Sequence, residues 1–228
     1  MTRWLPLLLV LGCGGTQTVP AATLGERHFS DPALSTSPFN AASCATCHQV
    51  AKAPVARNDP GVNLYDVVHR PVWWGGYEST LLSAANYCLT EFMGGAALTM
   101  DDDRARELYE YLAQNSPDDP APAMPLTVVK NVTPLTNLAG DAAHGKEVFD
   151  RSCRRCHGDP HTGNGRLSTK VSIIPNDTLK AFPTNARAVT VEKVRHGRFF
   201  NIGGIMPLYS AEAISDQEIA DILAYLGL

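Results

Sequence analysis

Two short stretches of this chain combine a pair of cysteines with an adjacent histidine. Cys-Ala-Thr-Cys-His occupies residues 44–48, and Cys-Arg-Arg-Cys-His occupies residues 153–157. Two thiols three residues apart can add to the two vinyl groups on one edge of a porphyrin. The histidine that follows is then carried beneath the ring, where its imidazole can ligate the iron. This spacing is typical of the attachment site of a c-type haem.

Other kinds of site contain cysteines at this spacing, namely thioredoxin-like redox pairs and halves of zinc sites. A redox pair does not need the histidine, and neither stretch follows a strand and opens a helix. With 6 cysteines and 7 histidines in 228 residues, a random order would give only about 0.005 such motifs. We therefore predict two covalently bound haem c groups. The residues predicted to hold them are Cys44, Cys47, His48, Cys153, Cys156 and His157.

Residues 141–228 carry the signals of a helical haem unit. Gly145, Phe149 and Cys153 fall at i, i+4 and i+8, so they share one face of a helix that leads into the second motif. The chain ends with a capping box that begins at Ser215 and an apolar stripe with helical spacing. The order of helix, Cys-x-x-Cys-His, loops, Met-Pro and terminal helix resembles the class I cytochrome c domain.

The iron of a haem needs a second axial ligand opposite the histidine. Met206 lies in a Gly-Gly-Ile-Met-Pro stretch just before the terminal helix, and residues 141–228 contain no other methionine. The glycines allow close approach to a ring and the proline stiffens the loop, so we predict Met206 as the sixth ligand. The class I resemblance also implies a proline carbonyl, in the Ile-Ile-Pro stretch at 173–175, that accepts the other imidazole N–H. We expect residues 195–198 in a surface loop near the haem edge, where arginines could bind propionates or stay solvated.

Two residues compete for the sixth position in the first unit. The terminal helices of the two units align at an offset of 114 residues, which places Met206 one residue from Met93. Met93 is therefore the predicted ligand. Cys88 is the alternative, because the Asn-Tyr-Cys stretch at 86–88 resembles the helix that supplies a thiolate to the first haem in di-haem thiosulfate dehydrogenases. A thiolate there would lower the reduction potential and make this haem a plausible catalytic centre.

The motifs and the composition between them divide the chain. The motifs are 109 residues apart, and residues 116–134 contain five prolines with few periodic apolar positions. We predict a mainly α-helical chain, with two cytochrome c-like haem domains joined by a proline-rich linker. The predicted boundaries are 25–115 for the first domain, 116–140 for the linker and 141–228 for the second domain.

The N-terminus predicts export. Residues 1–12 combine Arg3 with a short apolar run that ends in Val-Leu-Gly-Cys, which resembles a bacterial lipobox. We predict a signal peptide at 1–12, a lipid on Cys13 and a tether at 13–24, with a cut near residues 21–22 as the alternative. The expected location is periplasmic, on a membrane through the lipid. The formal net charge of −4 argues against nucleic acid as a partner.

An electron-carrying role follows most directly from these assignments. Histidine and methionine ligands leave no open position on the iron, so such a centre changes charge without binding a substrate. We predict an extracytoplasmic di-haem cytochrome c that relays electrons between redox partner proteins. Two enzymatic alternatives remain: thiosulfate dehydrogenase-like activity, through Cys88, and activity like that of the di-haem cytochrome c peroxidases, whose segment before the first haem resembles residues 25–44. A haem subunit of a larger oxidoreductase is a third possibility.

Overall fold

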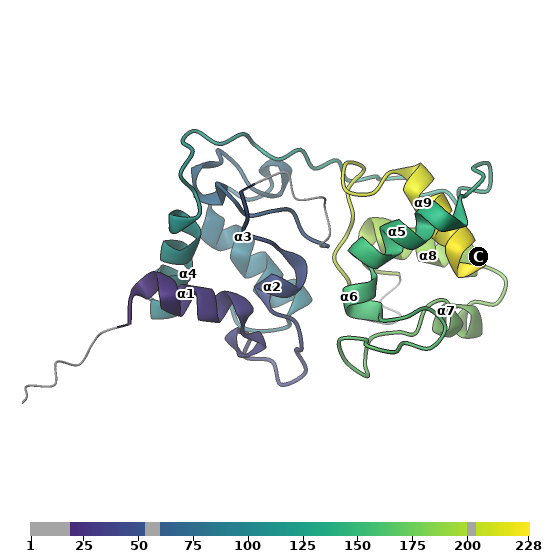
Figure 1. Cartoon of the computed structure of the whole chain (residues 1–228), viewed down its shortest axis with the longest axis horizontal. Helices are drawn as coiled ribbons and strands as arrows, with labels where there is room; N and C mark the ends of the chain where they lie inside the picture. Colours follow the sequence, from purple (N-terminus) through teal and green to yellow (C-terminus); the bar gives the residue numbers. More distant parts are fainter. Residues whose placement is uncertain (1–18, 53–59, 200–203) are drawn as a thin grey trace, which may run out of the picture.

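The computed structural model describes residues 19–52, 60–199 and 204–228, and within these ranges the chain is helical with long irregular loops. Figure 1 shows two groups of helices, α1 to α4 and α5 to α9, joined by an extended segment that runs along one edge of both. The described residues form no strand; a single antiparallel bridge links Trp73 and Glu78. The prediction of a mainly α-helical fold is confirmed.

The α-helices differ in length, and the haem motifs lie in the two shortest. They are α1 (Ala21–Ser30), α2 (Cys44–Cys47), α3 (Leu81–Tyr87), α4 (Asp103–Gln114), α5 (Ala142–Ser152), α6 (Arg154–His157), α7 (Asn176–Ala181), α8 (Ala186–His196) and α9 (Asp216–Leu226). Shorter turns are η1 (Pro32–Leu34), η2 (Val67–His69), η3 (Trp74–Gly76) and a π turn, η4 (Cys88–Phe92). Within the described ranges, no helix has both the length and the apolar character needed to cross a bilayer.

The two groups of helices repeat one packing arrangement. In each, the helix before the haem motif crosses the last helix of the group, α1 against α4 and α5 against α9. A glycine lies at each crossing: a Cβ on Gly25 would lie 2.0 Å from the Glu107 carbonyl oxygen, and a Cβ on Gly145 would lie 1.9 Å from that of Asp221. Only glycine therefore permits these backbone contacts.

An aromatic pair packs beside each crossing, four residues after the glycine of one helix and four residues after its backbone contact on the other. Phe29 lies 5.4 Å from Tyr111 between ring centroids, and Phe149 lies 5.6 Å from Tyr225. The tilted and edge-on geometries of these pairs are the favoured ones for aromatic rings. The Gly-x-x-x-Phe spacing at 145–149, which predicts α5, recurs at 25–29 in α1.

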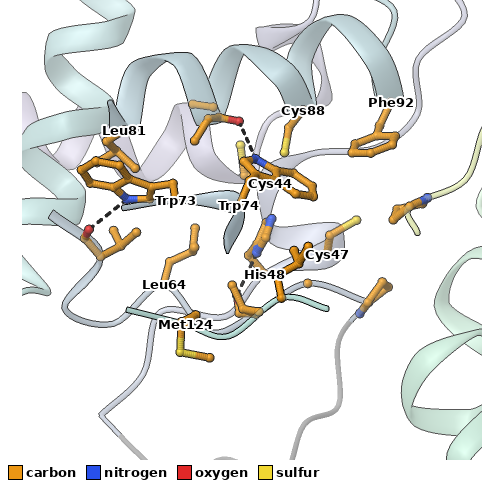
Figure 2. A pocket seen from close by; sticks show the side chains of 18 of the residues that line it. Cys44, Cys47, His48, Leu64, Trp73, Trp74, Leu81, Cys88, Phe92 and Met124 are labelled. Atoms are coloured by element: carbon orange, nitrogen blue, oxygen red, sulfur yellow. Dashed lines mark hydrogen bonds between the residues drawn. The ribbon is translucent and has the colours of Figure 1, made fainter. Parts of the chain in front are cut away.

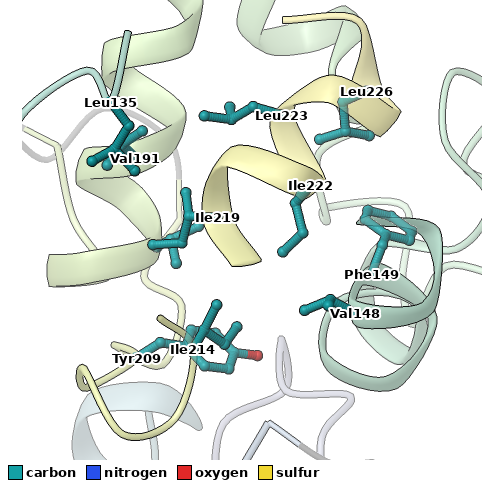
Figure 3. Close-up of a cluster of buried hydrophobic side chains, with 11 residues drawn as sticks. Leu135, Val148, Phe149, Val191, Tyr209, Ile214, Ile219, Ile222, Leu223 and Leu226 are labelled. Atoms are coloured by element: carbon teal, nitrogen blue, oxygen red, sulfur yellow. The ribbon is translucent and has the colours of Figure 1, made fainter. Parts of the chain in front are cut away.

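Each group of helices has its own apolar core. The buried residues of the second core come from α5, α8, α9, the loop before α9 and, with Leu135, the segment before α5, and they surround the inner face of α9 (Figure 3). Those of the first core come from α1, α4, the turns η1, η2 and η4, and the segment between η4 and α4. The second core contains Leu135, Val148, Phe149, Val191, Val194, Tyr209, Ile214, Ile219, Ile222, Leu223 and Leu226. The first contains Phe29, Leu34, Val67, Leu89, Met93, Leu98, Leu108 and Leu112.

A buried carboxylate ties the start of α5 to α9. Asp221 is 2% exposed and accepts hydrogen bonds from the backbone N–H of Asp141 at 2.8 Å, from His144 Nδ1 at 2.7 Å and from Gln217 Nε2 at 2.9 Å. Burial alone would raise the pKa of this carboxyl, but the hydrogen bonds from His144, Asp141 and Gln217 outweigh it and hold the pKa below its usual value. The hydrogen bond to Asp221 in turn raises the pKa of His144.

Asp221→Asn is expected to lower the free energy of unfolding by about 1–3 kcal/mol, because an amide cannot accept from all three donors. Because the pKa of Asp221 is lowered in the folded protein, its contribution to the free energy of unfolding is present above the carboxyl pKa of the unfolded chain. This contribution is lost as pH falls through the pKa of the folded protein. The raised pKa of His144 means that its contribution is complete below the unfolded imidazole pKa and is lost as pH rises through the folded value. The deficit should therefore be largest between pH about 4 and about 6.5.

Urea unfolding at several pH values measures this deficit. Glu147→Gln is the matched control, since it removes an exposed carboxylate from the same helix. A deficit that is the same at pH 3 and pH 6, or that Glu147→Gln reproduces, would contradict the role given to Asp221.

Several predicted elements appear with small changes in their ends. The helix predicted before the second motif is α5, and the capping box at Ser215 and Glu218 starts α9. Helix α1 begins at Ala21, inside the segment expected to be a tether at 13–24, because its buried face packs on α4. The predicted signal peptide and Cys13 lie outside the described residues.

The proline-rich segment between the helix groups is bound to both of them. The Ala121 N–H donates to the His69 carbonyl of the first group at 3.2 Å. The Ala211 N–H of the second group donates to the Thr127 carbonyl at 3.1 Å, and His196 Nε2 lies 2.7 Å from the Val129 carbonyl oxygen. Leu135 joins the second core. The segment is therefore fixed by hydrogen bonds along its length as well as by its prolines.

Candidate haem sites

The first motif forms a compact turn with a fixed histidine. Ser43 and Thr46 make a capping box around α2, and His48 follows directly after it. The His48 Nδ1–H donates to the Val62 carbonyl at 2.8 Å. Gly61 lies against the imidazole, and a Cβ at this position would come within 2.4 Å of the ring. A backbone acceptor on one ring nitrogen fixes the orientation of the ring and leaves the other nitrogen for a metal.

A cavity of about 240 Å³ opens beside this turn, and most of its lining is apolar. Figure 2 shows the cysteines and His48 at one wall and residues of α3 and η4 at the wall facing them. The lining also includes Met124, Pro125 and Leu126 from the linker, and Pro207, Leu208, Ser210 and Ala213 from the second helix group. An apolar cavity with two thiols and an imidazole on one wall fits a macrocycle attached by thioether bonds.

Both candidates for the sixth ligand line this cavity. Met93 is 6% exposed and belongs to the first apolar core, and its carbonyl accepts from the Ser35 hydroxyl at 2.9 Å. Cys88 is the first residue of the π turn, and Figure 2 shows its thiol directed into the cavity on the side opposite His48. π turns of this kind are frequent at functional sites.

Aromatic residues pack around the facing wall. The indole of Trp74 lies 5.2 Å from the Tyr87 ring and 6.2 Å from the Phe92 ring, centroid to centroid, and its Nε1–H donates to the Ala84 carbonyl at 3.3 Å. Trp74 has a φ of 50°, which is rare for a bulky residue. A backbone held in this region is characteristic of ligand-binding sites.

The cysteines of both motifs lie in apolar surroundings. Burial raises the pKa of the thiols of Cys44 to about 11 and of Cys47 and Cys153 to about 12. Burial likewise raises the pKa of Cys88 to about 12. A thiol in such a place is protonated at neutral pH and becomes a thiolate when it coordinates a cation. The cysteines in the described part of the chain form no disulfide with one another.

The second motif is built in the same way as the first. It spans the end of α5 and all of α6, and the His157 Nδ1–H donates to the Ser172 carbonyl at 3.0 Å. Burial lowers the pKa of His157, so the ring is neutral and able to ligate a metal. The loop predicted to pass this histidine does so, but the acceptor is Ser172 and not the proline of the 173–175 stretch. The carbonyl of Ile174, which precedes that proline, accepts from the His161 N–H instead.

Met206 lies in the loop between α8 and α9. Its side chain is partly buried and packs against the second core, as do Cys153 and Ile174. Its N–H donates to the Gly197 carbonyl at 3.1 Å. Gly197 has a φ of 69°, and a Cβ there would lie 2.1 Å from the Met206 carbonyl oxygen, so this glycine permits the close approach of the loop to the end of α8. The structure thus brings Met206 and the second motif to one core.

The expectation of a surface loop at 195–198 is wrong for its first two residues, which end α8. Arg195 is 1% exposed, and its guanidinium donates to the carbonyls of Tyr209 at 3.2 Å and Ile214 at 2.7 Å and pairs with Asp216 at 2.6 Å. These contacts hold the loop before α9, so Arg195 is neither solvated nor available to a haem propionate. His196 pairs with Glu192 at 2.6 Å.

Comparison with known proteins finds a family match for the second unit. The family model "Cytochrome C oxidase, cbb3-type, subunit III" matches residues 140–226. The chain is 34% identical over 95 residues to cytochrome c-554(547) of Halothiobacillus neapolitanus, which covers 39% of this chain and 97% of that protein. It is also 34% identical over 91 residues to cytochrome c6 of a Synechocystis species, covering 40% of this chain and 68% of that protein.

A longer but weaker similarity includes the first unit. The chain is 26% identical over 191 residues to the thiosulfate dehydrogenase of Psychrobacter arcticus, covering 82% of this chain and 55% of that protein. The chain therefore spans about half the length of this relative. Since the chain is 34% identical to nearly a whole cytochrome c, and residues 140–226 match the family model and carry the Cys-x-x-Cys-His turn with a fixed histidine, the chain belongs to the cytochrome c family, whose members transfer electrons through covalently bound haem.

Proposed function

We propose that this protein is an extracytoplasmic di-haem cytochrome c that relays electrons between redox partner proteins. The observation that carries the proposal is that both motifs end in a histidine with one ring nitrogen bound to a backbone carbonyl, at 2.8 Å for His48 and 3.0 Å for His157. A histidine oriented in this way can present its other ring nitrogen to iron. Haem supplies a centre that gains and loses one electron, and the surrounding residues set its potential.

In the proposed assignment, each unit supplies two thioether cysteines and one histidine to its haem. Met206 is the sixth ligand in the second unit, supported by its place on the same core as Cys153. Met93 is the predicted sixth ligand in the first unit, but the geometry favours Cys88. Figure 2 shows the Cys88 thiol on the side of the cavity away from His48, with the Trp74 indole drawn between them, whereas Met93 also belongs to the apolar core. A thiolate ligand would give the first haem a lower potential than the second.

Near-infrared and electron paramagnetic resonance spectra of the oxidised holoprotein test the ligand assignments. Met206→Ala should abolish the methionine–iron(III) charge-transfer band, because the second haem loses its thioether ligand. Cys88→Ser should remove a thiolate signature and raise the potential of the first haem, while Met93→Leu should leave that haem nearly unchanged. A spectrum altered by Met93→Leu and not by Cys88→Ser would assign the ligand to Met93. An intact mass without two haem increments would refute the di-haem proposal.

A lipid on Cys13 is the proposed membrane attachment, and replacement of this residue tests it. Cys13→Ala should release the protein into the soluble extracytoplasmic fraction, because the acyl chains that hold a lipoprotein to the membrane are missing. Fractionation of cells followed by haem staining measures the distribution. The variant Thr16→Ala, which alters a nearby residue of the same segment, is the control and should stay in the membrane fraction. Membrane attachment of Cys13→Ala would contradict the lipid anchor.

Oxidation of a sulfur compound at the first haem is the second candidate function. It is favoured by Cys88 in the cavity and by the similarity to a thiosulfate dehydrogenase over 82% of the chain. The two functions differ in what reduces the protein. If thiosulfate alone reduces the oxidised holoprotein, and Cys88→Ser prevents this, the enzymatic function holds. If thiosulfate leaves it oxidised while a reduced cytochrome c donates electrons to it, the relay function holds.

A further inference from the structure

The two haem-attachment turns contact each other directly. Arg155 lies between the two cysteines of the second motif, and its Nη1 donates to the carbonyls of Ala45 at 2.8 Å and of Thr46 at 3.1 Å. These two acceptors lie between the cysteines of the first motif. One side chain thus joins the middle of one turn to the middle of the other.

The acceptors suit a guanidinium group. Helix α2 is only four residues long, and the last carbonyls of any helix have no partner within that helix. A cation at this end of a helix is also favoured by the direction of the peptide dipoles. Both hydrogen bonds come from one nitrogen, Nη1, whose N–H groups are held in the plane of the guanidinium, so the contact fixes a direction as well as a distance.

Two other cations of the second unit reach the first unit, but they bind it differently. Lys170 Nζ lies 3.6 Å from the centroid of the Phe39 ring, and Arg198 pairs with Glu91. Phe39 is 72% exposed, and both side chains of the Arg198–Glu91 pair are more than a third exposed. Ion pairs between exposed, flexible side chains contribute little to a fixed geometry. Arg155 is itself exposed, but of these three cations it alone donates to the backbone of a haem-attachment turn.

We infer that Arg155 is a positioning residue that holds the first attachment turn at one distance and orientation from the second. The two haem groups then exchange electrons across a single defined gap. This role in electron transfer rests on the proposed di-haem function, whereas the contact itself belongs to the polypeptide. The residue acts through the backbone of α2 and is not a ligand of either haem.

The chain offers a closely matched control. Arg154 is the neighbour of Arg155 in the same motif and has the same charge. Its guanidinium pairs with Asp159 at 2.7 Å and with Asp150 at 3.7 Å, both within the second unit. Arg154→Gln therefore removes one positive charge from the motif without removing a contact to the first unit. Arg155→Lys keeps the charge and replaces the planar guanidinium with an ammonium group on a flexible stem.

The experiment compares the full-length holoprotein with Arg155→Gln, Arg154→Gln and Arg155→Lys. Pulsed electron paramagnetic resonance of the oxidised protein measures the distribution of iron–iron distances, and hydrogen–deuterium exchange measures the opening of residues 44–50. The wild type and Arg154→Gln should give one narrow distribution. Arg155→Gln should broaden it and speed the exchange of residues 44–50 by about fivefold or more, as expected for the loss of two hydrogen bonds. Arg155→Lys should lie between them.

If Arg155→Gln matches Arg154→Gln in both measurements, the inference is wrong. Intact mass separates this result from a failure of the proposed function. A chain with fewer than two haem groups would refute the di-haem proposal and the defined gap between haems. The exchange of residues 44–50 would still decide whether Arg155 positions the turn, because that measurement needs no iron–iron distance.

Discussion

Replacing both Cys153 and Cys156 with serine in the full chain is expected to give a protein with one haem fewer and an unstable second unit. Cys153 packs against the second apolar core beside Met206 and Ile174, so a missing macrocycle leaves that side of the core without its partner. Units of this size bury little surface on their own. Losing a covalently held apolar group should remove most of a total stability of about 5–15 kcal/mol.

Intact mass and thermal unfolding followed by circular dichroism measure this outcome. The matched variant replaces Cys44 and Cys47 with serine, which should also remove one haem but leave the spectrum of the second haem in place. An unchanged mass in either variant would show that its cysteines do not carry a haem. A second unit that unfolds with its original midpoint after losing its haem would contradict the structural role given to the group.

Gly145→Val is expected to separate α5 from α9 and to destabilise the second unit by roughly 3 kcal/mol or more. A Cβ at this position would lie 1.9 Å from the Asp221 carbonyl oxygen and 2.3 Å from its carbonyl carbon. These are backbone atoms of α9, and they cannot rotate away as a side chain would. The whole crossing must therefore widen, and the packing of Phe149 on Tyr225 is lost with it.

Thermal unfolding of the holoprotein, followed at each haem's own absorption, measures the effect. Gly25→Val should destabilise the first unit instead, because its Cβ would lie 2.0 Å from the Glu107 carbonyl oxygen. Ala143→Val is the control, since it places the same side chain at an exposed position of α5. If Gly145→Val unfolds at the same temperature as Ala143→Val, the close crossing of α5 and α9 does not exist in solution.

Local patterns in the sequence were sufficient to predict α5, the motif and α9 in the second unit, but not α7 or α8. The i, i+4 spacing of Gly145 and Phe149 predicted α5, and the capping box at Ser215 predicted the start of α9. Both signals act over less than two turns of helix, so they can be recognised without knowing the fold. The first unit has the same spacing at Gly25 and Phe29, but a longer loop separates α1 from its motif, so the spacing alone does not connect this helix with the haem-attachment turn.

Contacts between distant segments could not be predicted in this way. Nothing near Arg195 indicates that it will be buried among the carbonyls of the loop before α9. The acceptor for His157 is a backbone carbonyl, which any residue supplies, so no residue type points to Ser172. The sequence also cannot decide between Met93 and Cys88. The π turn η4 rotates the residues that follow it relative to an ordinary helix, and this turn cannot be predicted from local spacing.

The cavity beside the first motif has walls from three parts of the chain, since linker residues 124–126 and residues of the loop before α9 complete it. The polarity around a haem and its access to water help to set its reduction potential. A fragment that ended after α4 would open this cavity to solvent on the side that those residues cover. In the proposed di-haem protein, the electrochemistry of the first haem is therefore a property of the whole polypeptide, and the first unit is not a module that evolution or engineering could transfer alone without changing its potential.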